Sequence, residues 1–541
     1  MSAMISRRSF LQLSASGLVA VLHTDSEWEA DIAIIGGGTG GCAAALAALR
    51  MNQRVVLTEE TEWIGGQFTQ QGVPPDEHQW IEFQGATDRY RAFRADVRDY
   101  YRRLYPLVDP TVELLNPGTC GVSRLCHEPR AALAVLTDWF APYLSTGQLR
   151  IMLNVRPFSA EVSGDRIQAV QLSPSGPVIR AKYFLDATED GVLLDLSQTE
   201  HVMGAEPDTG ELHASPRPGP QNMQAPTWCF AMDYQPEEDH TIEPPESYSY
   251  WRDYVPPIDP PWPGKLLSLT YSHPITLEPR VASFDPRPGA ITENFNLWTY
   301  RRLIDPGLFA SGAYEGGISL VNWPQNDYMN GNLFADSDSA LHRQAARELS
   351  FSLFYWLQTE VPREDGGQGW PGLRLRGDIM GTEDGLAKAP YLRESRRIMS
   401  MFTVTENHVG TEARKGAERA EHFEDSVGVG SYRIDLHPST GGDNYIDVAS
   451  LPFEIPLGAL IPVRTENLLP AAKNIGVTHI TGGCYRLHPV EWNIGEAAGA
   501  LAAWCIARNV KPRGVRDKHL REFQDVLAGQ GVQLRWPESI Y

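Results

Sequence analysis

The sequence predicts an α/β fold built on a Rossmann-like dinucleotide-binding domain. An apolar run at residues 31–35 leads into Gly36-Gly37-Gly38-Thr39-Gly40-Gly41, and an Ala-rich segment follows at 42–49. A second apolar run at 54–57 ends close to Glu59. Strand, tight turn, helix and strand in this order are the start of a βαβ unit.

A change of composition predicts a second region within this fold. Prolines and aromatic residues crowd together between residues 204 and about 331, and helical periodicity returns at 340–357. Such a stretch is typical of a loop-rich insertion whose aromatic residues pack its own core. We therefore expect a mixed α+β substrate domain inserted into the dinucleotide-binding domain.

The glycine-rich turn is the strongest indication of a ligand. Gly36, Gly38 and Gly41 fall in the G-x-G-x-x-G register, which allows a sharp turn, close approach to a pyrophosphate and tight helix packing. Thr39 and Gly40 begin the helix, whose free N–H groups favour an anion. Glu59 lies where an acidic side chain meets ribose hydroxyls. An ordinary glycine-rich loop is the alternative.

Other elements follow from periodicity. Helices are expected at 129–143 and 493–507, a strand at 149–155, and an antiparallel meander at 158–162, 166–172 and 178–184. The predicted division is 1–29 for a signal and linker, 30–203 for the first part of the dinucleotide-binding domain, 204–450 for the substrate domain, and 451–541 for the second part and tail.

Bulk properties exclude some functions. A chain of 541 residues is too long for one compact core, and a net charge of −21 argues against nucleic acid or an anionic membrane as partner. Arg7 and Arg8, followed by Phe-Leu and a short apolar stretch, look like a twin-arginine export signal, with a chance basic start as the alternative. We expect an exported protein, periplasmic or secreted, with no membrane span in the mature chain.

Cysteine usage predicts no metal site. The six cysteines form no C-x-x-C pair, so a zinc site is not expected. Cys120 and Cys126 are close enough in sequence for a disulfide in an oxidising compartment, and two free thiols remain equally open.

The segment after the first βαβ unit carries further polar residues. Gly65-Gly66 lets the backbone pass close to a ligand, and Gln67 follows directly. Arginines and aromatic residues between 90 and 103 have the spacing of a solvated amphipathic helix. His78 and Glu82 lie near the glycine pair and are candidate site residues.

The ordered motifs together carry a family resemblance. The chain resembles the FAD-dependent oxidoreductase family of bacterial flavoproteins, which belongs with the glutathione reductase type two flavin fold. The matching pieces are Gly36-x-Gly38-x-x-Gly41 with Glu59, Gly65-Gly66, the stretches 186–191 and 393–398, Asp435-Leu436-His437, and Arg486-Leu487-His488-Pro489 leading to the stretch 495–499.

The resemblance implies FAD as cofactor and a place for each motif. The first glycines and Glu59 would hold the ADP half of FAD. The backbone at Gly65-Gly66 would run beside the ribityl and phosphate region, and the backbone at Ala187-Thr188 would run close to the pyrophosphate. Pro157 would offer backbone to the adenine without an N–H. The helix beginning near Asn493 and Ile494 would point at the pyrimidine carbonyl end of the flavin. Relatives commonly have Gly-Arg where this chain has Ala472-Lys473.

The expected activity is hydride transfer from a small organic substrate, such as a sugar or another alcohol, to the flavin. His488 is the predicted proton acceptor, Arg486 the residue that orients the substrate, and His78 a weaker alternate. A core histidine satisfied by a backbone carbonyl is the alternative for His488. Electrons would pass to oxygen or an exported acceptor.

Two other functions remain open. A flavin monooxygenase or halogenase would need an external reductant, and the sequence shows neither a W-x-W-x-I-P nor a G-D-A-A-H stretch. A non-catalytic secreted flavoprotein is the third hypothesis.

Overall fold

The computed structural model describes residues 27–335 and 337–540. Arg7 and Arg8 lie outside these residues, so the export prediction is not tested by the structure. Among the described helices, none is both long enough and apolar enough to cross a membrane.

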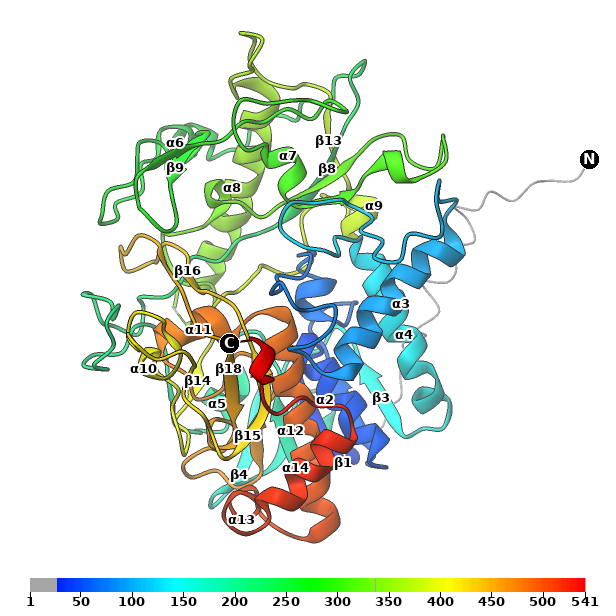
Figure 1. Cartoon of the computed structure of the whole chain (residues 1–541), viewed down its shortest axis with the longest axis vertical. Coiled ribbons are helices and arrows are strands. Elements are labelled where there is room, and N and C mark those ends of the chain that lie inside the picture. Colours follow the sequence, from blue (N-terminus) through cyan, green and yellow to red (C-terminus); the bar gives the residue numbers. More distant parts are fainter. Residues whose placement is uncertain (1–26, 336, 541) are drawn as a thin grey trace, which may run out of the picture.

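The lower half of Figure 1 is organised by a seven-stranded sheet with the order β3-β2-β1-β6-β5-β4, to which β19 adds along β6. Strands β3, β2, β1, β6 and β19 are parallel, whereas β4, β5 and β6 form an antiparallel meander. This arrangement confirms the predicted Rossmann-like α/β fold. The strands are β1 (Glu27–Ile35), β2 (Val55–Thr58), β3 (Leu149–Met152), β4 (Ser159–Ser163), β5 (Arg166–Gln171), β6 (Val178–Asp186) and β19 (Leu468–Pro470).

The central strand β1 is buried on both faces, which is why its sequence is continuously apolar at its end. Ile32 and Ile34 contribute to the large core shared with the Ala-rich helix α2 (Thr39–Arg50). Ala33 and Ile35 contribute to a separate core with the meander and the helix α5 (Val192–Leu196).

Helix α12 (His488–Arg508) packs along α2 and joins the two ends of the chain. Glycines allow this close approach: a Cβ on Gly495 would lie 2.0 Å from the Gly40 carbonyl oxygen, and one on Gly499 would lie 2.2 Å from the Ala44 carbonyl oxygen. The prediction that this helix begins near Asn493 is corrected, because it begins at His488. Pro489 fits the first helical turn, where a missing N–H costs no hydrogen bond.

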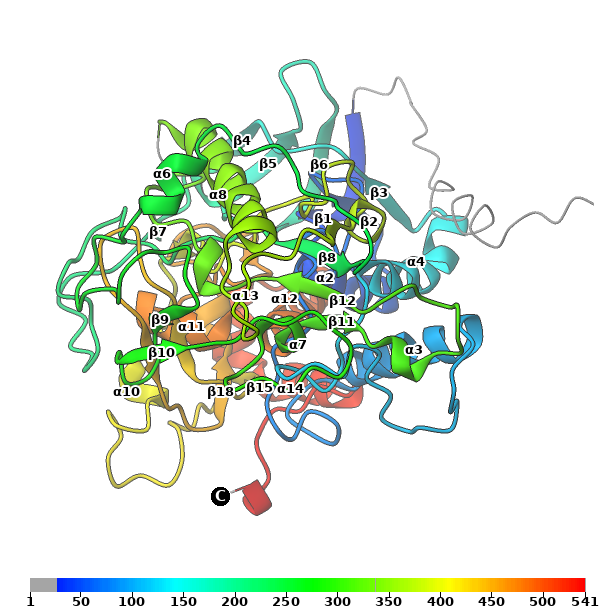
Figure 2. The ribbon, with the colours of Figure 1, turned by 90° about the horizontal axis from the view of Figure 1, so that it is seen from above.

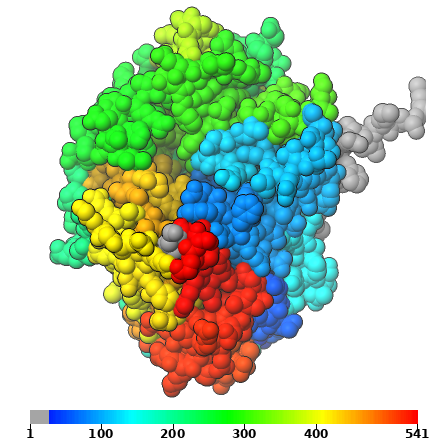
Figure 3. All heavy atoms as spheres, in the orientation of Figure 1, coloured from blue at the N-terminus to red at the C-terminus, as the bar shows by residue number. Residues whose placement is uncertain are grey.

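A second, antiparallel sheet lies at the other end of the molecule, where Figures 1 and 3 show the segment coloured green. Its order is β11-β12-β8-β13, and the long helix α8 lies near it in the view from above (Figure 2). Its elements are β8 (Phe230–Tyr234), β11 (Arg302–Ile304), β12 (Ile318–Val321), β13 (Leu373–Leu375) and α8 (Ser339–Thr359). The predicted domain limits at 204 and 450 stay a prediction.

Short elements complete the described chain. The two-stranded sheets are β9 (Thr270–Ser272) with β10 (Pro279–Val281), β7 (His201–Val202) with β14 (Arg397–Ile398), β15 (Ser426–Gly430) with β18 (Phe453–Pro456), and β16 (Ile434–Leu436) with β17 (Ile446–Val448). The remaining helices are α3 (Asp88–Leu104), α4 (Pro129–Ser145), α6 (Tyr248–Asp253), α7 (Leu297–Tyr300), α9 (Gly377–Met380), α10 (Glu406–Val409), α11 (His479–Tyr485), α13 (Pro512–Lys518) and α14 (Leu520–Gly529).

Helix α3 differs from the solvated helix that the sequence predicts. Arg94 and Arg98 are buried, and both guanidinium groups bind the Glu82 carboxylate, at 2.6 Å and 2.7 Å. Arg94 also binds Glu77 at 3.0 Å. Because buried charges need partners, these residues form a structural ion-pair network, and Glu82 is occupied within it.

The question left open for two cysteines is resolved by the structure. Cys120 and Cys126 form a disulfide, with their Cα atoms 6.1 Å apart. The other four cysteines, Cys42, Cys229, Cys484 and Cys505, are buried free thiols.

Substitution of Gly495 tests the contact between α2 and α12. A Cβ at this position meets backbone atoms of Gly40, which cannot move aside as a flexible side chain would. We expect Gly495→Ala to lower the free energy of unfolding by about 1–3 kcal/mol. The control is Gly529→Ala in α14, where a Cβ meets nothing within 4 Å. Thermal melting of both variants checks this, and equal melting temperatures would contradict it.

Candidate functional site

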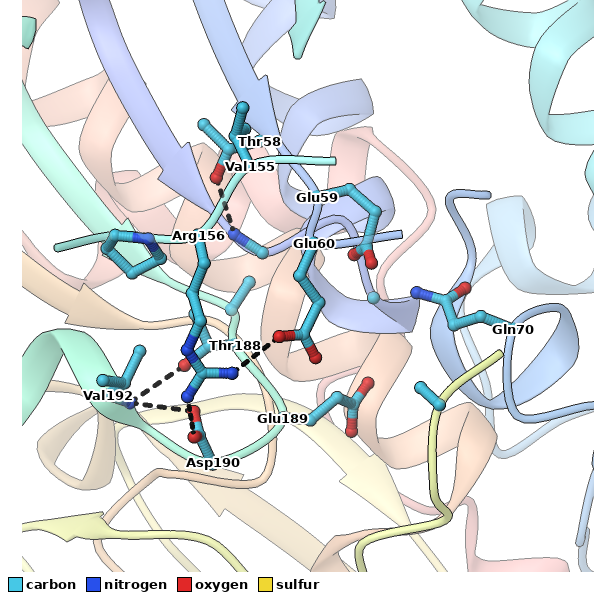
Figure 4. Close-up of a pocket in the computed structure, with 15 residues that line it drawn as sticks. Thr58, Glu59, Glu60, Gln70, Val155, Arg156, Thr188, Glu189, Asp190 and Val192 are labelled. Atoms are coloured by element: carbon cyan, nitrogen blue, oxygen red, sulfur yellow. Dashed lines mark hydrogen bonds and ion pairs between the residues drawn. The ribbon is translucent and has the colours of Figure 1, made fainter. Parts of the chain in front are cut away.

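A pocket of about 420 Å³ lies where β1, β2 and β6 end (Figure 4). Three predicted segments meet in it, the glycine turn, the end of β2 and the end of β6, although they are far apart in the sequence. Six predicted residues line it: Gly36, Gly38, Glu59, Pro157, Ala187 and Thr188. Glu189 and Asp190, from the predicted stretch 186–191, and Arg156, next to Pro157, also line it. The lining residues that sequence reasoning did not select are Thr58, Glu60, Gln70, Val155, Val192 and Ala389.

The glycine turn leaves no room for side chains. Gly36 has a φ of +103°, and a Cβ there would lie 2.3 Å from the Ala187 carbonyl carbon and oxygen. The Gly65 N–H donates to the Gly37 carbonyl at 2.7 Å, and the Thr39 hydroxyl donates to the Gly65 carbonyl at 3.0 Å. The two glycine motifs are thus held against each other at the start of α2.

Glu59 faces this turn from the end of β2. Its Oε2 accepts from the Gly37 N–H at 3.0 Å, and its Oε1 accepts from the Thr61 N–H at 2.9 Å. Burial, with an addition from the charge of Glu60, raises the pKa of Glu59 to about 8. A buried carboxyl at this place is suited to the hydroxyl groups of a ribose.

The side chain of Arg156, which the sequence analysis did not consider, also lines the pocket. In Figure 4 the Arg156 guanidinium lies between Glu60 and Asp190, which it binds at 2.6 Å and 2.5 Å. The Thr188 hydroxyl donates to the Asp186 carboxylate at the end of β6, at 2.7 Å. Pro157 lies beside Arg156 in the wall of the pocket.

A buried charge cluster lies at the N-terminus of α2. The Glu491 carboxylate accepts from the Gly40 N–H at 3.4 Å and from the Gln67 amide at 2.7 Å. Lys473 binds Glu189 and lies 4.0 Å from Glu491. Glu491 is on α12, so its contact with the Gly40 N–H depends on the packing of α12 on α2, whereas Lys473 comes from the segment after β19.

Opposing effects decide how these groups ionise. Burial raises the pKa of Glu491 to about 7. The positive charge of Lys473 lowers this pKa, whereas the negative charge of Glu189 raises it. Burial alone would lower the pKa of Lys473, but the carboxylates of Glu189 and Glu491 outweigh it and raise the pKa above its ordinary value. Lys473 therefore stays charged beside a glutamic acid that titrates near neutral pH.

Gln67 connects the glycine turn with a second polar cluster. The Tyr391 hydroxyl donates to the Gln67 side-chain oxygen at 3.2 Å. Arg486 donates to the Tyr391 hydroxyl at 3.1 Å and to the Asp435 carboxylate at 3.2 Å. The predicted residues Gln67 and Arg486 are thus brought together, and the Gln67 amide also donates to the Arg486 carbonyl at 3.0 Å.

Two buried arginines in this region have an unused donor. Arg301 binds Asp76 at 3.1 Å. Burial raises the pKa of Asp76, but the charges of Arg301 and Arg486 and the hydrogen bond from Arg301 oppose burial, and the pKa lies below its ordinary value. The Nε atoms of Arg301 and Arg486 are buried and have no hydrogen-bond partner in the described part of the chain. Because buried donors are normally satisfied, these atoms mark a place for a ligand or water.

The structure places His488 as a structural residue. Its Nδ1 accepts from the Asp76 N–H at 3.1 Å, and its Nε2 contacts the Val73 carbonyl at 3.2 Å. Burial is the largest cause that lowers its pKa to about 3. This is the alternative that the sequence left open, a core histidine satisfied by backbone, and a role as proton acceptor is not favoured by this geometry.

His78 is engaged in the same way. Its Nε2 contacts the Gly85 carbonyl at 3.1 Å, and its Nδ1 accepts from the Trp80 N–H at 3.2 Å. Burial lowers its pKa to about 4, and its ring packs edge-on against Trp536. The geometry does not favour His78 as the alternate base.

Asn493 and Ile494 lie inside α12, away from its first turn. The Asn493 amide donates to the Val427 carbonyl at 3.3 Å, and its oxygen accepts from the Val429 N–H at 3.3 Å. Ile494 is fully buried in the large core. Their predicted place at the helix N-terminus is therefore corrected, since the first turn contains His488 and Glu491.

The described residues contain no group of three or more His, Cys, Asp or Glu side chains arranged to hold a metal ion. The pocket instead fits FAD: the glycine turn excludes side chains, the carboxyl of Glu59 meets the turn, and the start of α2 offers N–H groups to a diphosphate.

Comparisons with known proteins agree with this fit. A sequence profile of the family described as FAD dependent oxidoreductase matches residues 31–527. No curated protein matches the chain.

Solved structures are similar over part of the chain. Sdh1 of Mycobacterium smegmatis, in complex with UQ1, matches 30% of this chain and 34% of its own, with 11% identity and a TM-score of 0.22. L-proline dehydrogenase from P. horikoshii matches 34% of this chain and 25% of its own, with 16% identity and a TM-score of 0.18. Thioredoxin reductase from T. acidophilum matches 34% of this chain and 39% of its own, with 15% identity and a TM-score of 0.17. The chain thus spans about a third of the length of Sdh1.

Protonation of Glu491 is expected to control FAD affinity. The FAD diphosphate adds negative charge near α2, which favours the protonated carboxyl, so binding takes up a proton. Since the pKa of Glu491 without FAD is about 7, affinity is full below that pH and falls above it, by up to about tenfold per pH unit.

Quenching of FAD fluorescence by the apoprotein, measured between about pH 6 and pH 9, checks this prediction. Glu491→Gln should lose the part of the fall that begins near pH 7, whereas any part due to Glu59, whose pKa is about 8, should remain. Glu496→Gln is the matched control on the same helix, because its carboxylate binds the Trp492 ring nitrogen at 3.2 Å instead. The same pH dependence in Glu491→Gln and in the wild type would contradict the prediction.

Proposed function

The chain belongs to the FAD-dependent oxidoreductase family, and from this premise we propose that it oxidises a small polar organic substrate, such as a sugar or another alcohol, by hydride transfer. The observation that carries the proposal is the buried cluster beyond Gln67, where Arg486 and Arg301 each keep an unpartnered Nε donor within the described structure. An oxygen of the substrate would satisfy these donors, which an apolar substrate would leave unpaired.

The residues of the cluster have separable tasks. Bound FAD supplies the two-electron acceptor. Arg486, fixed by Tyr391 and Asp435, orients a substrate oxygen through its free Nε and stabilises negative charge that develops on it. His488 is a positioning residue: it binds the backbone of Asp76, whose carboxylate in turn holds Arg301.

Export and the final electron acceptor are part of the same proposal. The Ser6 to Gln12 stretch with its two arginines supports translocation of a folded, cofactor-loaded protein. The disulfide between Cys120 and Cys126 is suited to an oxidising compartment. Electrons would then leave to oxygen or to an exported acceptor.

Anaerobic mixing with candidate alcohols, sugars and amines tests the function. We expect the yellow flavin absorbance to bleach with a substrate and without any nicotinamide. Bleaching by NADH or NADPH alone would indicate a monooxygenase or halogenase, and a flavin that no substrate bleaches would indicate a non-catalytic flavoprotein. With the substrate found, Arg486→Lys should raise the half-saturating concentration by about tenfold to a hundredfold, because the planar fork is lost. Arg464→Lys, at a partly exposed ion pair with Glu200, is the control.

Replacement of the two N-terminal arginines tests export. The full-length chain with Arg7→Lys and Arg8→Lys should remain in the cytoplasm of a host that has the twin-arginine pathway, whereas the wild type should reach the periplasm or medium. Cell fractionation with flavin fluorescence as the readout measures this. Equal distribution of both proteins would overturn the export proposal.

A further inference from the structure

A histidine outside the predicted site residues is paired with a buried aspartate. His437 follows β16, and Asp327 follows the 3-10 turn Pro324–Asn326 near the second sheet. The His437 Nδ1 lies 2.5 Å from the Asp327 Oδ2. The Asp327 side chain is fully buried, whereas 18% of the His437 side chain is exposed.

The surroundings keep Asp327 ionised. Its second oxygen accepts from the Thr227 hydroxyl at 2.5 Å and lies 3.2 Å from the Arg393 guanidinium. Burial raises the pKa of Asp327, but the charge of Arg393 and the hydrogen bonds from His437 and Thr227 oppose burial, and the pKa lies below its ordinary value. An ionised carboxylate only accepts hydrogen bonds, so the Nδ1 proton of His437 lies on this bond. The Nε2 of a neutral His437 is then the proton acceptor of the ring.

That Nε2 has no hydrogen-bond partner within residues 27–335 and 337–540. This distinguishes His437 from His488 and His78, whose two ring nitrogens both have backbone partners. Several other histidines also have a carboxylate on Nδ1: His213, His422, His479 and His519. His422 differs from His437 in that its Nε2 lies 3.6 Å from Glu424 and its side chain is half-exposed.

The dyad borders the cluster around Arg486. Asp435, two residues before His437, binds Arg486, and Tyr391 joins Arg486 to Gln67. The Tyr445 ring lies 5.3 Å from the His437 ring, and the buried Tyr445 hydroxyl has no partner among the described residues. The charges of Asp327, Arg393 and Asp435 all act on this hydroxyl. Tyr445, whose hydroxyl is unpartnered, thus packs against the His437 ring, and Arg486, whose Nε is unpartnered, binds the Asp435 carboxylate two residues before it.

We propose that His437, oriented by Asp327, is the proton acceptor of the substrate oxidation. The inference rests on the proposed function. For an alcohol, His437 Nε2 would take the hydroxyl proton, and FAD, when bound, would supply the acceptor for the hydrogen and two electrons that the carbon loses as hydride. The carbon–oxygen bond becomes a carbonyl, and the neutral imidazole becomes an imidazolium that the Asp327 carboxylate stabilises.

Several charged or titratable groups face this imidazole, and they bear on any pH profile. They are Asp327 after the 3-10 turn, Arg393 on the segment before β14, Asp435 on β16, Asp447 on β17, and Tyr445 before it. Asp447 lies in the field of His437 and binds Arg433, so its charge is compensated. The fixed partner on Nδ1 remains Asp327.

Anaerobic flavin reduction of the FAD-loaded protein tests this role. With a substrate that bleaches the wild type, His437→Gln should slow reduction by about 100-fold to 10,000-fold. The remaining rate should lose the decline towards acidic pH that a protonated imidazole base causes, and added imidazole should restore part of it. Asp327→Asn, which keeps the side-chain size, should also slow reduction because it changes the tautomer of the ring. His422→Gln is the matched control and should reduce at the wild-type rate.

The outcomes separate the two proposals. No bleaching of the wild type by any substrate would overturn the proposed function together with this inference. Bleaching of the wild type with an equal rate in His437→Gln would overturn the inference alone. A slower His437→Gln that keeps the wild-type pH profile and is not rescued by imidazole would show a structural role and would also overturn it. FAD binding and thermal melting confirm that each variant is folded.

Discussion

The close contact between α2 and α12 is the constraint on which the site depends. Gly40 and Gly495 tolerate no side chain: a Cβ on Gly495 would meet the Gly40 backbone, and a Cβ on Gly40 would lie 1.8 Å from the Ala471 carbonyl oxygen and 3.2 Å from that of Glu491. Residues from the two ends of the chain therefore meet at one glycine turn: the Gly40 N–H and the Glu491 carboxylate are 451 positions apart in sequence. The dinucleotide site is complete only when α12 has packed against α2.

This packing buries charges, and their pairing shapes the chemistry of the interior. Lys473 lies between two carboxylates at the start of α2, and Arg301 and Arg486 are paired with Asp76 and Asp435. A buried charge without a partner would be strongly destabilising, so each cation has an anion close by. A guanidinium has five N–H donors, however, and one or two carboxylate contacts do not use them all. The pairing thus explains both the stability of the cluster and the donors that remain for a substrate.

The sequence predicted the parts of the structure that depend on local patterns. The spacing of Gly36, Gly38 and Gly41 and the apolar run of β1 are local, and the predicted α/β fold was confirmed. The start of α12 was placed five residues late because Pro489 was not used as a first-turn residue. Burial of Arg94 and Arg98 could not be read from helical spacing, since it depends on Glu82, which lies before the helix.

The two histidines show why site chemistry needs long-range contacts. His488 stands in a motif with Arg486, and its residue type alone suits a base, but its partners are backbone groups at Val73 and Asp76, more than 400 positions away in sequence. Backbone partners on both nitrogens satisfy the ring and leave it without a free lone pair for a substrate proton. His437 has a carboxylate on one nitrogen only, contributed by Asp327 from the second sheet region. A site for chemistry requires a polar atom that the fold orients and leaves without a partner. Tyr445, with an unpartnered hydroxyl, packs against the His437 ring, and Arg486, with an unpartnered Nε, binds Asp435 two residues before His437.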